Sequence, residues 1–529
     1  MIPSNSPATL ALKALKTPSG ASLTLVSLVT LWHLLLAGQL NLSVDEAHYA
    51  LYGLKPDWSY FDHPPMVGWL NALILPFTHS DFGLRLLPAT LFALSNWMLY
   101  RLTLRLFPDF QWGGFWTLAL VNSAIMFQLL SLSMLPDTPL MLASLMLFWH
   151  LLNLRESETH SRRALKNWLW IGFWLGIAAL SKYTAITLVL SLLLVMLMEK
   201  RFFWLKDKGL WLAVILTSLM ITPVLYWNAN HDWVSFLYQL NHGQHHDHWD
   251  WQRALNTQLA QLGVYSPLLY LAGLWLMLQA WRNPAPAADS IRLLAAFALP
   301  IIVLFALNSG YEMSLPHWTQ LAWLLISPAV VYWVWQHWAR RAVRTLVYIS
   351  SALTLTVSLA LNSLLALPWM PFPDNENPVR ELHGWAQTVA LAQSFQNDQQ
   401  QPPLFAPNWT QASRIGWYAY PQPVYVTDNR FDQFDLWYGQ PAPGSDGLLI
   451  VPSYEDIPPK TARPGHFQQC HLLAENPIRE PNRFGENDIT VVTYRIYHCQ
   501  GLEAAQYQGW AAELPLVKRL ESGHNVGLR

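Results

Sequence analysis

A short stretch near the start of the chain holds residue types that could catalyse a group transfer. Residues 43–70 read SVDEAHYALYGLKPDWSYFDHPPMVGWL and contain two acidic motifs, Asp45-Glu46 and Asp62-His63. A carboxylate can take the proton of an acceptor hydroxyl, and a protonated histidine can hold the charge of a phosphate. We therefore interpret Asp45 and Glu46 as candidate catalytic residues and Asp62 and His63 as candidate substrate contacts. The alternatives are capping of a helix N-terminus for the first motif and a purely structural role for the second.

Further ionisable residues interrupt the apolar stretches that follow. Asp137 in SMLPDTPLM is a candidate catalytic acid, with capping of the next helix as its alternative. Lys182 in ALSKYTAITL could hold a phosphate, or could extend its ammonium group to the membrane surface. Other candidate substrate contacts are Tyr60, Tyr183, His231, Arg253 and His317.

A histidine-rich segment, NHGQHHDHWDW, is the one place where the sequence suggests a divalent metal. Imidazole and carboxylate groups are common metal ligands, and a histidine-rich surface loop without metal is the alternative interpretation. The candidate ligands are His242, His245 and His246. No other cofactor is expected, because the sequence contains no nucleotide-binding loop.

The first acidic stretch itself predicts the elements that would hold its carboxylates. An amphipathic pattern after Asp45 predicts a helix along the membrane surface. Pro64-Pro65 predicts the start of a second helix, because proline suits the first helical turn. We expect these helices to hold Asp45 and Asp62 at rigid ends near the bilayer.

Composition indicates a membrane protein. Of the 529 residues, 53% are hydrophobic and only 12% are charged, about half the charged share of soluble proteins. About 20 apolar residues span a bilayer core, and the first such stretch is expected to be a retained helix and not a cleaved signal peptide. We expect about eleven membrane-spanning helices, near residues 21–40, 83–107, 113–131, 138–153, 167–181, 183–199, 209–227, 258–281, 292–308, 317–336 and 343–367.

Lys and Arg positions predict the orientation of these helices. With the N-terminus in the cytoplasm, 17 of the 21 basic residues before residue 370 fall in cytoplasmic segments, as the excess of basic residues on that side requires. This orientation places the candidate residues on the extracytoplasmic face. Ionisable groups near hydrocarbon are costly, which makes them functional candidates.

The last part of the chain has a different character. Residues 370–529 have no apolar run long enough to span a membrane, and short alternating runs at 423–426, 448–451 and 489–497 predict strands. We therefore predict a transmembrane domain over 1–369, with a catalytic loop at 41–82, and an extracytoplasmic mixed α/β domain over 370–529. The chain's two cysteines, Cys470 and Cys499, lie in the latter domain, where they form either a disulfide or two free thiols.

Six motifs together resemble the bacterial glycosyltransferases related to the protein O-mannosyltransferases (the family 39 or 83 type), which include the lipid A aminoarabinose transferases. The motifs cover roughly residues 20–335 and read DEAHYALYG, YFDHPPMVGWL, SMLPDTPLM, ALSKYTAITL, PVLYWNANHDWVSFLYQL and LPHWTQLAW. The resemblance implies a GT-C fold in the bacterial cytoplasmic (inner) membrane. It also implies transfer of a sugar from polyprenyl phosphate, usually undecaprenyl phosphate, to a lipid A, glycan or protein acceptor on the outer side.

The resemblance also implies roles for individual residues. Asp45, with Glu46 beside it, corresponds to the acid that acts as a base or orients the acceptor, and Asp137 corresponds to the family's acid at the mouth of the third span. The aminoarabinose transferases have an acid followed by lysine and proline where this chain has Asp62, His63 and proline. The phosphate-binding role of position 63 therefore stays open, and the sequence names neither the sugar nor the acceptor.

Two other classes of function are alternatives to an enzyme. A transporter or flippase of a lipid-linked glycan would place ionisable residues near mid-span, often in broken helices, whereas here they gather at one face. A non-catalytic scaffold would not need such a density of polar residues. The basic residues mark helix ends and not a nucleic-acid surface, so the expected partners are membrane lipid, a lipid-linked sugar and its acceptor.

Overall fold

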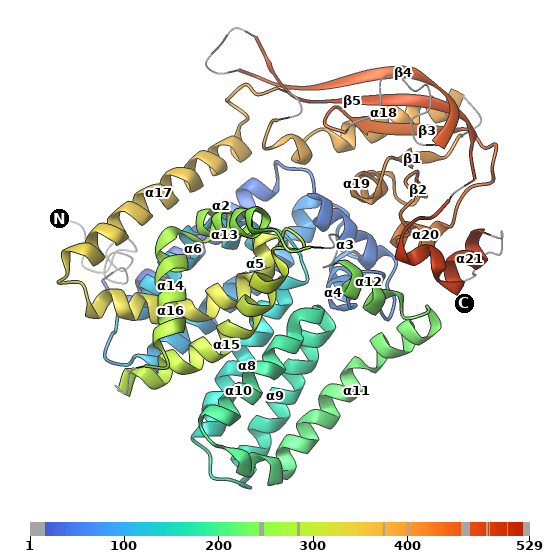
Figure 1. Ribbon diagram of the computed structural model, residues 1–529. Coiled ribbons are helices and arrows are strands. Elements are labelled where there is room, and N and C mark those ends of the chain that lie inside the picture. Colours follow the sequence, from blue (N-terminus) through green and yellow to red (C-terminus); the bar gives the residue numbers. More distant parts are fainter. Residues whose placement is uncertain are drawn as a thin grey trace. The chain divides into compact units, whose positions relative to one another are not determined.

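The structure is a computed structural model whose elements are labelled in Figure 1. It falls into two compact units, one made of residues 1–35, 85–225 and 242–359 and the other of residues 36–84, 226–241 and 360–529. The described residues are 16–242, 248–282, 286–373, 376–398, 401–455, 466–482, 485, 487–504 and 506–521.

The first unit is helical, and each of the eleven predicted stretches forms a helix or a pair of helices. Helix α8 packs against α9, and α10 packs against α15 (Figure 1). Residues 320–332 of α16 are buried on all sides. The helices, some of which extend past the edge of the unit, are α2 (Pro18–Ala37), α5 (Asp81–Leu106), α6 (Gly113–Ser123), α7 (Ile125–Leu132), α8 (Asp137–Arg155), α9 (Arg162–Ser181), α10 (Ile186–Met198), α11 (Lys208–Asn230), α13 (Trp251–Tyr265), α14 (Pro267–Gln279), α15 (Pro286–Asn308), α16 (Gln320–Gln336) and α17 (Arg341–Ala366).

Several of these helices can cross a membrane, so the chain is a multi-pass membrane protein. Helices α2, α11 and α17 and residues 288–308 of α15 are long and apolar enough to cross it singly. The α6–α7 and α13–α14 pairs pass the same test only as bent pairs. The number of about eleven spans and their orientation stay predictions.

Two predicted spans are wrong as continuous helices. The stretch near 113–131 bends by 81° at Ala124, and the stretch near 258–281 bends by 115° at Ser266. Ser266 precedes a proline, which disfavours helical backbone in the residue before it. At the first bend, the Gln128 side chain donates to the carbonyl oxygens of Asn122 and Ser123, which supplies partners for groups that a broken helix leaves unpaired.

The second unit contains the predicted mixed α/β fold. Its sheet has the order β2-β1-β3-β5-β4, with β1 parallel to β2 and β3 and with β5 antiparallel to β3 and β4. Figure 1 shows β4 and β5 as the long pair of the sheet. The elements are α18 (Trp385–Asp398), β1 (Leu404–Ala406), α19 (Trp409–Ala419), β2 (Val424–Val426), α20 (Gln433–Tyr438), β3 (Gly447–Pro452), β4 (Phe467–Glu480), β5 (Ile489–Leu502) and α21 (Pro515–Glu521).

The first loop of the chain belongs to this second unit. It forms the two predicted helices, α3 (Val44–Leu54) and α4 (Met66–Ile74), and the unit also includes most of α12 (Val234–His242). Leu51 of α3 lies in one hydrophobic cluster with Trp385, Ile415 and Phe434. The loop therefore packs as part of the C-terminal fold, a grouping that the predicted boundary at residue 370 did not anticipate.

Cys470 and Cys499 form a disulfide between the paired strands β4 and β5. The bond closes a loop of 29 residues in sequence separation, and closing a loop of this size stabilises a fold by about 3 kcal/mol. We expect a Cys470→Ser/Cys499→Ser protein to unfold at a lower temperature than the oxidised wild type in a thermal melt. A reductant should lower the wild-type melting temperature and leave that of the double variant unchanged; equal melting temperatures would contradict the prediction.

Candidate functional site

The first turn of α3 gives its two acids different environments. Glu46 is buried, and its Oε2 accepts a hydrogen bond from the backbone N–H of Ser43 at 2.9 Å, within a capping box. Asp45 lies in the same turn and is partly exposed. The capping alternative therefore holds for Glu46, while catalysis by Asp45 stays a prediction.

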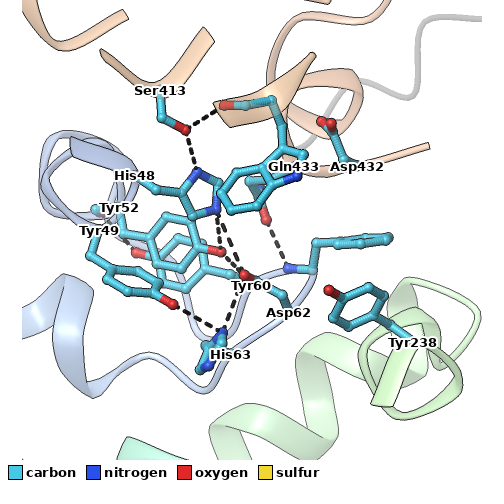
Figure 2. A network of polar contacts seen from close by, with 12 residues as sticks. His48, Tyr49, Tyr52, Tyr60, Asp62, His63, Tyr238, Ser413, Asp432 and Gln433 are labelled. Atoms are coloured by element: carbon cyan, nitrogen blue, oxygen red, sulfur yellow. Dashed lines mark hydrogen bonds and ion pairs between the residues drawn. The ribbon is translucent and has the colours of Figure 1, made fainter. Parts of the chain in front are cut away.

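Asp62 lies at the centre of a polar network in the second unit (Figure 2). Its carboxylate accepts a hydrogen bond from the Tyr52 hydroxyl and lies 3.2 Å from Nδ1 of His63 and 3.8 Å from Nε2 of His48. Burial opposes ionisation of this carboxyl, but His63, His48 and Tyr52 together outweigh burial and hold its pKa below the usual range. Asp62 is therefore a carboxylate that stays charged well into the acidic range.

The backbone around Asp62 is fixed by side chains from distant parts of the chain. Gln433 of α20 accepts from the N–H of Phe61 at 2.8 Å. From α12, the Ser235 hydroxyl donates to the carbonyl oxygen of Tyr60 and the Gln239 amide donates to that of Asp62, both at 2.7 Å. Three consecutive residues are thus held by one bond each, which keeps Asp62 in a single position.

His48 is a member of this network that the sequence did not single out. Its Nδ1 lies 3.0 Å from the Ser413 hydroxyl of α19 and its Nε2 lies 3.1 Å from the Tyr52 hydroxyl. Burial lowers the pKa of His48 to about 4, so the ring is neutral near pH 7. The i,i+4 spacing of His48 and Tyr52 was a signal that they share a helix face, but Ser413 could not be connected to them from the sequence.

The contacts of Tyr60 indicate a structural role. Its side chain is fully buried and its ring stacks on that of Tyr52 at 3.6 Å between centroids. The hydroxyl donates to the carbonyl oxygens of Tyr52 and Lys55 and accepts from the N–H of Asp57. We therefore leave Tyr60 out of the proposed substrate contacts.

Asp137 and Lys182 form a buried ion pair in the first unit. Nζ of Lys182 lies 2.7 Å and 3.0 Å from the two carboxylate oxygens of Asp137, and both side chains are less than a tenth exposed. Asp137 is the first residue of α8, and Lys182 follows the last residue of α9. The structure therefore joins two candidates that lie 45 residues apart in sequence.

The remaining candidates lie elsewhere in their units. Arg253 donates to the carbonyl oxygens of Gly310 and Tyr311, which gives its guanidinium group a role in holding that turn. His231 is buried and stacks on Trp227. Tyr183 begins a short 3₁₀ turn before α10, and His317 lies in another before α16. Their predicted contacts with substrate stay predictions.

The predicted metal ligands lie outside the described residues. His245 and His246 are in the gap between residues 242 and 248, and the His242 side chain is also outside. Among the described residues, no group of three or more His, Cys, Asp or Glu side chains is arranged to hold a metal ion.

Comparisons with known proteins give a family model that matches part of the chain and solved structures with a similar fold. Residues 62–227 match the family model described as dolichyl-phosphate-mannose-protein mannosyltransferase. The fold is similar to that of ArnT from Cupriavidus metallidurans in the apo state, with a TM-score of 0.57 and 14% identity over 90% of this chain and 98% of that one. The structure of the same ArnT bound to undecaprenyl phosphate gives a TM-score of 0.55 and 13% identity over the same shares. No match is found among curated protein sequences.

Proposed function

We propose that this chain is a GT-C membrane glycosyltransferase of the protein O-mannosyltransferase type, and that it uses a polyprenyl-phosphate-linked sugar with undecaprenyl phosphate as the carrier. The acceptor is a lipid A, glycan or protein molecule on the outer side of the bacterial cytoplasmic membrane. One observation carries the proposal: the matched segment, residues 62–227, contains Asp62, Asp137 and Lys182. The ArnT that shares this fold has been solved with undecaprenyl phosphate bound, which supports the choice of carrier.

The proposed chemistry is displacement of a lipid phosphate from the sugar's anomeric carbon by an acceptor oxygen. The leaving phosphate carries negative charge, which a nearby cation stabilises, and Lys182 is the proposed cation. Asp45 orients the acceptor or takes its proton. The buried Asp137 would hold Lys182 in place through their ion pair.

A transfer assay separates this proposal from the flippase alternative. Protein purified in detergent has no two compartments, so a flippase would yield no new covalent product there. We expect the purified chain to release polyprenyl phosphate and to glycosylate an acceptor, both read by mass spectrometry. Envelope glycolipids and glycoproteins of cells with and without the chain identify the acceptor. Absence of any covalent transfer with a range of polyprenyl-phosphate sugars would refute the proposed function.

Replacing Asp45 with asparagine should make cells resemble those that lack the protein. The substitution keeps size and removes the charge that the proposed role requires, and loss of acid–base assistance costs about 10²- to 10⁴-fold in rate. The measurement is the same mass-spectrometric profile of envelope glycoconjugates. Asp57→Asn is the matched control, because Asp57 is a partly exposed acid of the same loop, and its carboxylate accepts a hydrogen bond from Trp227. Full activity of Asp45→Asn would remove Asp45 from the mechanism.

A further inference from the structure

His63 presents one ring nitrogen to Asp62 and leaves the other available. Its Nδ1 lies 3.2 Å from a carboxylate oxygen of Asp62 and 3.5 Å from the Tyr49 hydroxyl. Within the described part of the chain, no hydrogen bond is recorded at Nε2, and the side chain is 19% exposed. Figure 2 shows His63 at the end of the network, on the far side of Asp62 from Ser413.

The charge of Asp62 determines which nitrogen of His63 carries the proton. A carboxylate only accepts hydrogen bonds, and the pKa of Asp62 lies below its usual range because its donors outweigh burial. The close Nδ1 of His63 must therefore donate to it. A neutral His63 then has its proton on Nδ1 and a lone pair on Nε2.

The rest of the network holds Asp62 in its charged form. The Tyr52 hydroxyl donates its proton to Asp62, so the Tyr52 oxygen accepts a hydrogen bond from Nε2–H of His48. The Ser413 hydroxyl donates to the carbonyl oxygen of Trp409 at 2.7 Å, and its Oγ lies 3.0 Å from Nδ1 of His48. The His48 and Tyr52 donors both point toward Asp62, and bonds aligned in this way strengthen one another.

A carboxylate that fixes one nitrogen of an imidazole, while the other nitrogen is available, is the arrangement of a general base and its positioning residue. We propose that His63, and not Asp45, takes the proton of an acceptor alcohol, that Asp62 positions the His63 ring, and that Asp45 orients the acceptor. This inference rests on the proposed function and narrows it, because a lone pair on Nε2 serves an acceptor that has a hydroxyl proton to lose. The acceptor class is therefore a carbon-bound hydroxyl, of a sugar or of a serine or threonine.

The balanced step has one bond made and one broken at the anomeric carbon. The acceptor oxygen bonds to that carbon as its proton moves to Nε2 of His63. The bond from the carbon to the phosphate oxygen breaks, and its electron pair leaves with the polyprenyl phosphate. The imidazolium that forms is stabilised by the charge of Asp62 until it returns the proton to solvent.

Two variants of His63 separate this role from the binding of phosphate by a cation. His63→Lys supplies a cation that cannot accept a proton near neutral pH, and His63→Gln supplies neither a base nor a charge. We expect both to lower kcat by about 100-fold or more, the usual range for a lost general base. The control is His79→Gln, an exposed histidine of the same unit that stacks on Trp417, which should retain wild-type kcat. Activity of His63→Lys near the wild-type value would overturn the proposal in favour of a cation.

The pH profile gives an independent test on the wild type. A base must be deprotonated before it can accept a proton, so kcat/KM of the wild type should rise with pH, whereas a phosphate-binding imidazolium predicts a fall. The His63→Gln profile should lose this rise. A falling wild-type profile contradicts the inference.

The product supplies the test of acceptor class. An O-glycoside on a carbon alcohol survives mild acid, whereas a glycosyl phosphate is cleaved, and mass spectrometry before and after treatment distinguishes them. An acid-labile glycosyl phosphate as the product would overturn the inference and leave the proposed function intact. If the wild type neither binds undecaprenyl phosphate nor transfers sugar, the proposed function itself fails. Thermal melts of each variant show whether it is folded.

Discussion

Replacing Asp62 with asparagine should lower kcat by about 10⁴-fold, the loss seen when the orienting carboxylate of a catalytic histidine is replaced by an amide. An amide can turn its NH₂ group toward Nδ1 of His63, which then accepts. The single proton of the neutral ring moves to Nε2, and the nitrogen that should take the acceptor's proton no longer has a lone pair. The geometry of the loop is largely kept, because Gln433, Ser235 and Gln239 hold backbone groups that the substitution does not touch.

The loss in Asp62→Asn can be separated from simple unfolding. Donor binding, measured with undecaprenyl phosphate, should change less than threefold, so that the effect falls on kcat and not on KM. Asp62→Glu keeps a carboxylate that can accept the hydrogen bond from His63. This variant should recover part of kcat, and its kcat/KM should still rise with pH. A near-wild-type rate in Asp62→Asn, or a rate lost together with the thermal transition, would show that Asp62 does not act through His63.

The local part of this network was predictable from sequence and its remote part was not. Asp62 and His63 are adjacent in the chain, and an acidic motif before Pro64 in an otherwise apolar protein is conspicuous. Ser413 lies 365 residues from His48 and Gln433 lies 372 residues from Phe61. Only the packing of the loop into the C-terminal fold brings them together, and a pattern of single residues carries no information about that packing.

The helices show the same division between local and distant causes. Apolar length predicted the position of each helical stretch, because about 20 apolar residues are what a bilayer requires. The bend at Ser266 had a local signal in Pro267, which the length of the stretch obscured. The bend at Ala124 has no proline or glycine at its position, and its exposed carbonyl groups are satisfied by Gln128, from the turn that follows. The sequence could therefore locate helices better than it could establish their continuity.

The position of Glu46 within the first helical turn of α3 explains its structural role, while the catalytic role of Asp45 stays a prediction. Glu46 is the third residue of α3 and accepts from the N–H of Ser43, as a capping box requires. Asp45 occupies the position before it and is partly exposed. The pattern of an acid pair after serine was compatible with both interpretations, and the structure shows Glu46 in a capping box.

Neutralising Lys182 alone should destabilise the protein strongly, since it leaves the Asp137 carboxylate buried without its cation. Removal of one partner of a buried ion pair costs about 3–5 kcal/mol, and the side chain of Asp137 is only 2% exposed. We expect both Lys182→Met and Asp137→Asn to lower the melting temperature in detergent. The melting temperature of the Lys182→Met/Asp137→Asn double variant should be higher than that of either single variant, because the double variant leaves no unpaired buried charge.

The double variant also separates stability from function in this pair. If Lys182 stabilises the leaving phosphate, the Lys182→Met/Asp137→Asn protein will be folded yet will transfer sugar at a strongly reduced rate. The matched control is the exposed pair of Lys518 and Glu513, where Lys518→Met should cost less than about 1 kcal/mol, as surface ion pairs do. Melting temperatures that fall additively, with the double variant lowest, would show that the two charges do not compensate each other. A stable double variant with full activity would confine the pair to a structural role, because the rate would then not depend on the Lys182 cation.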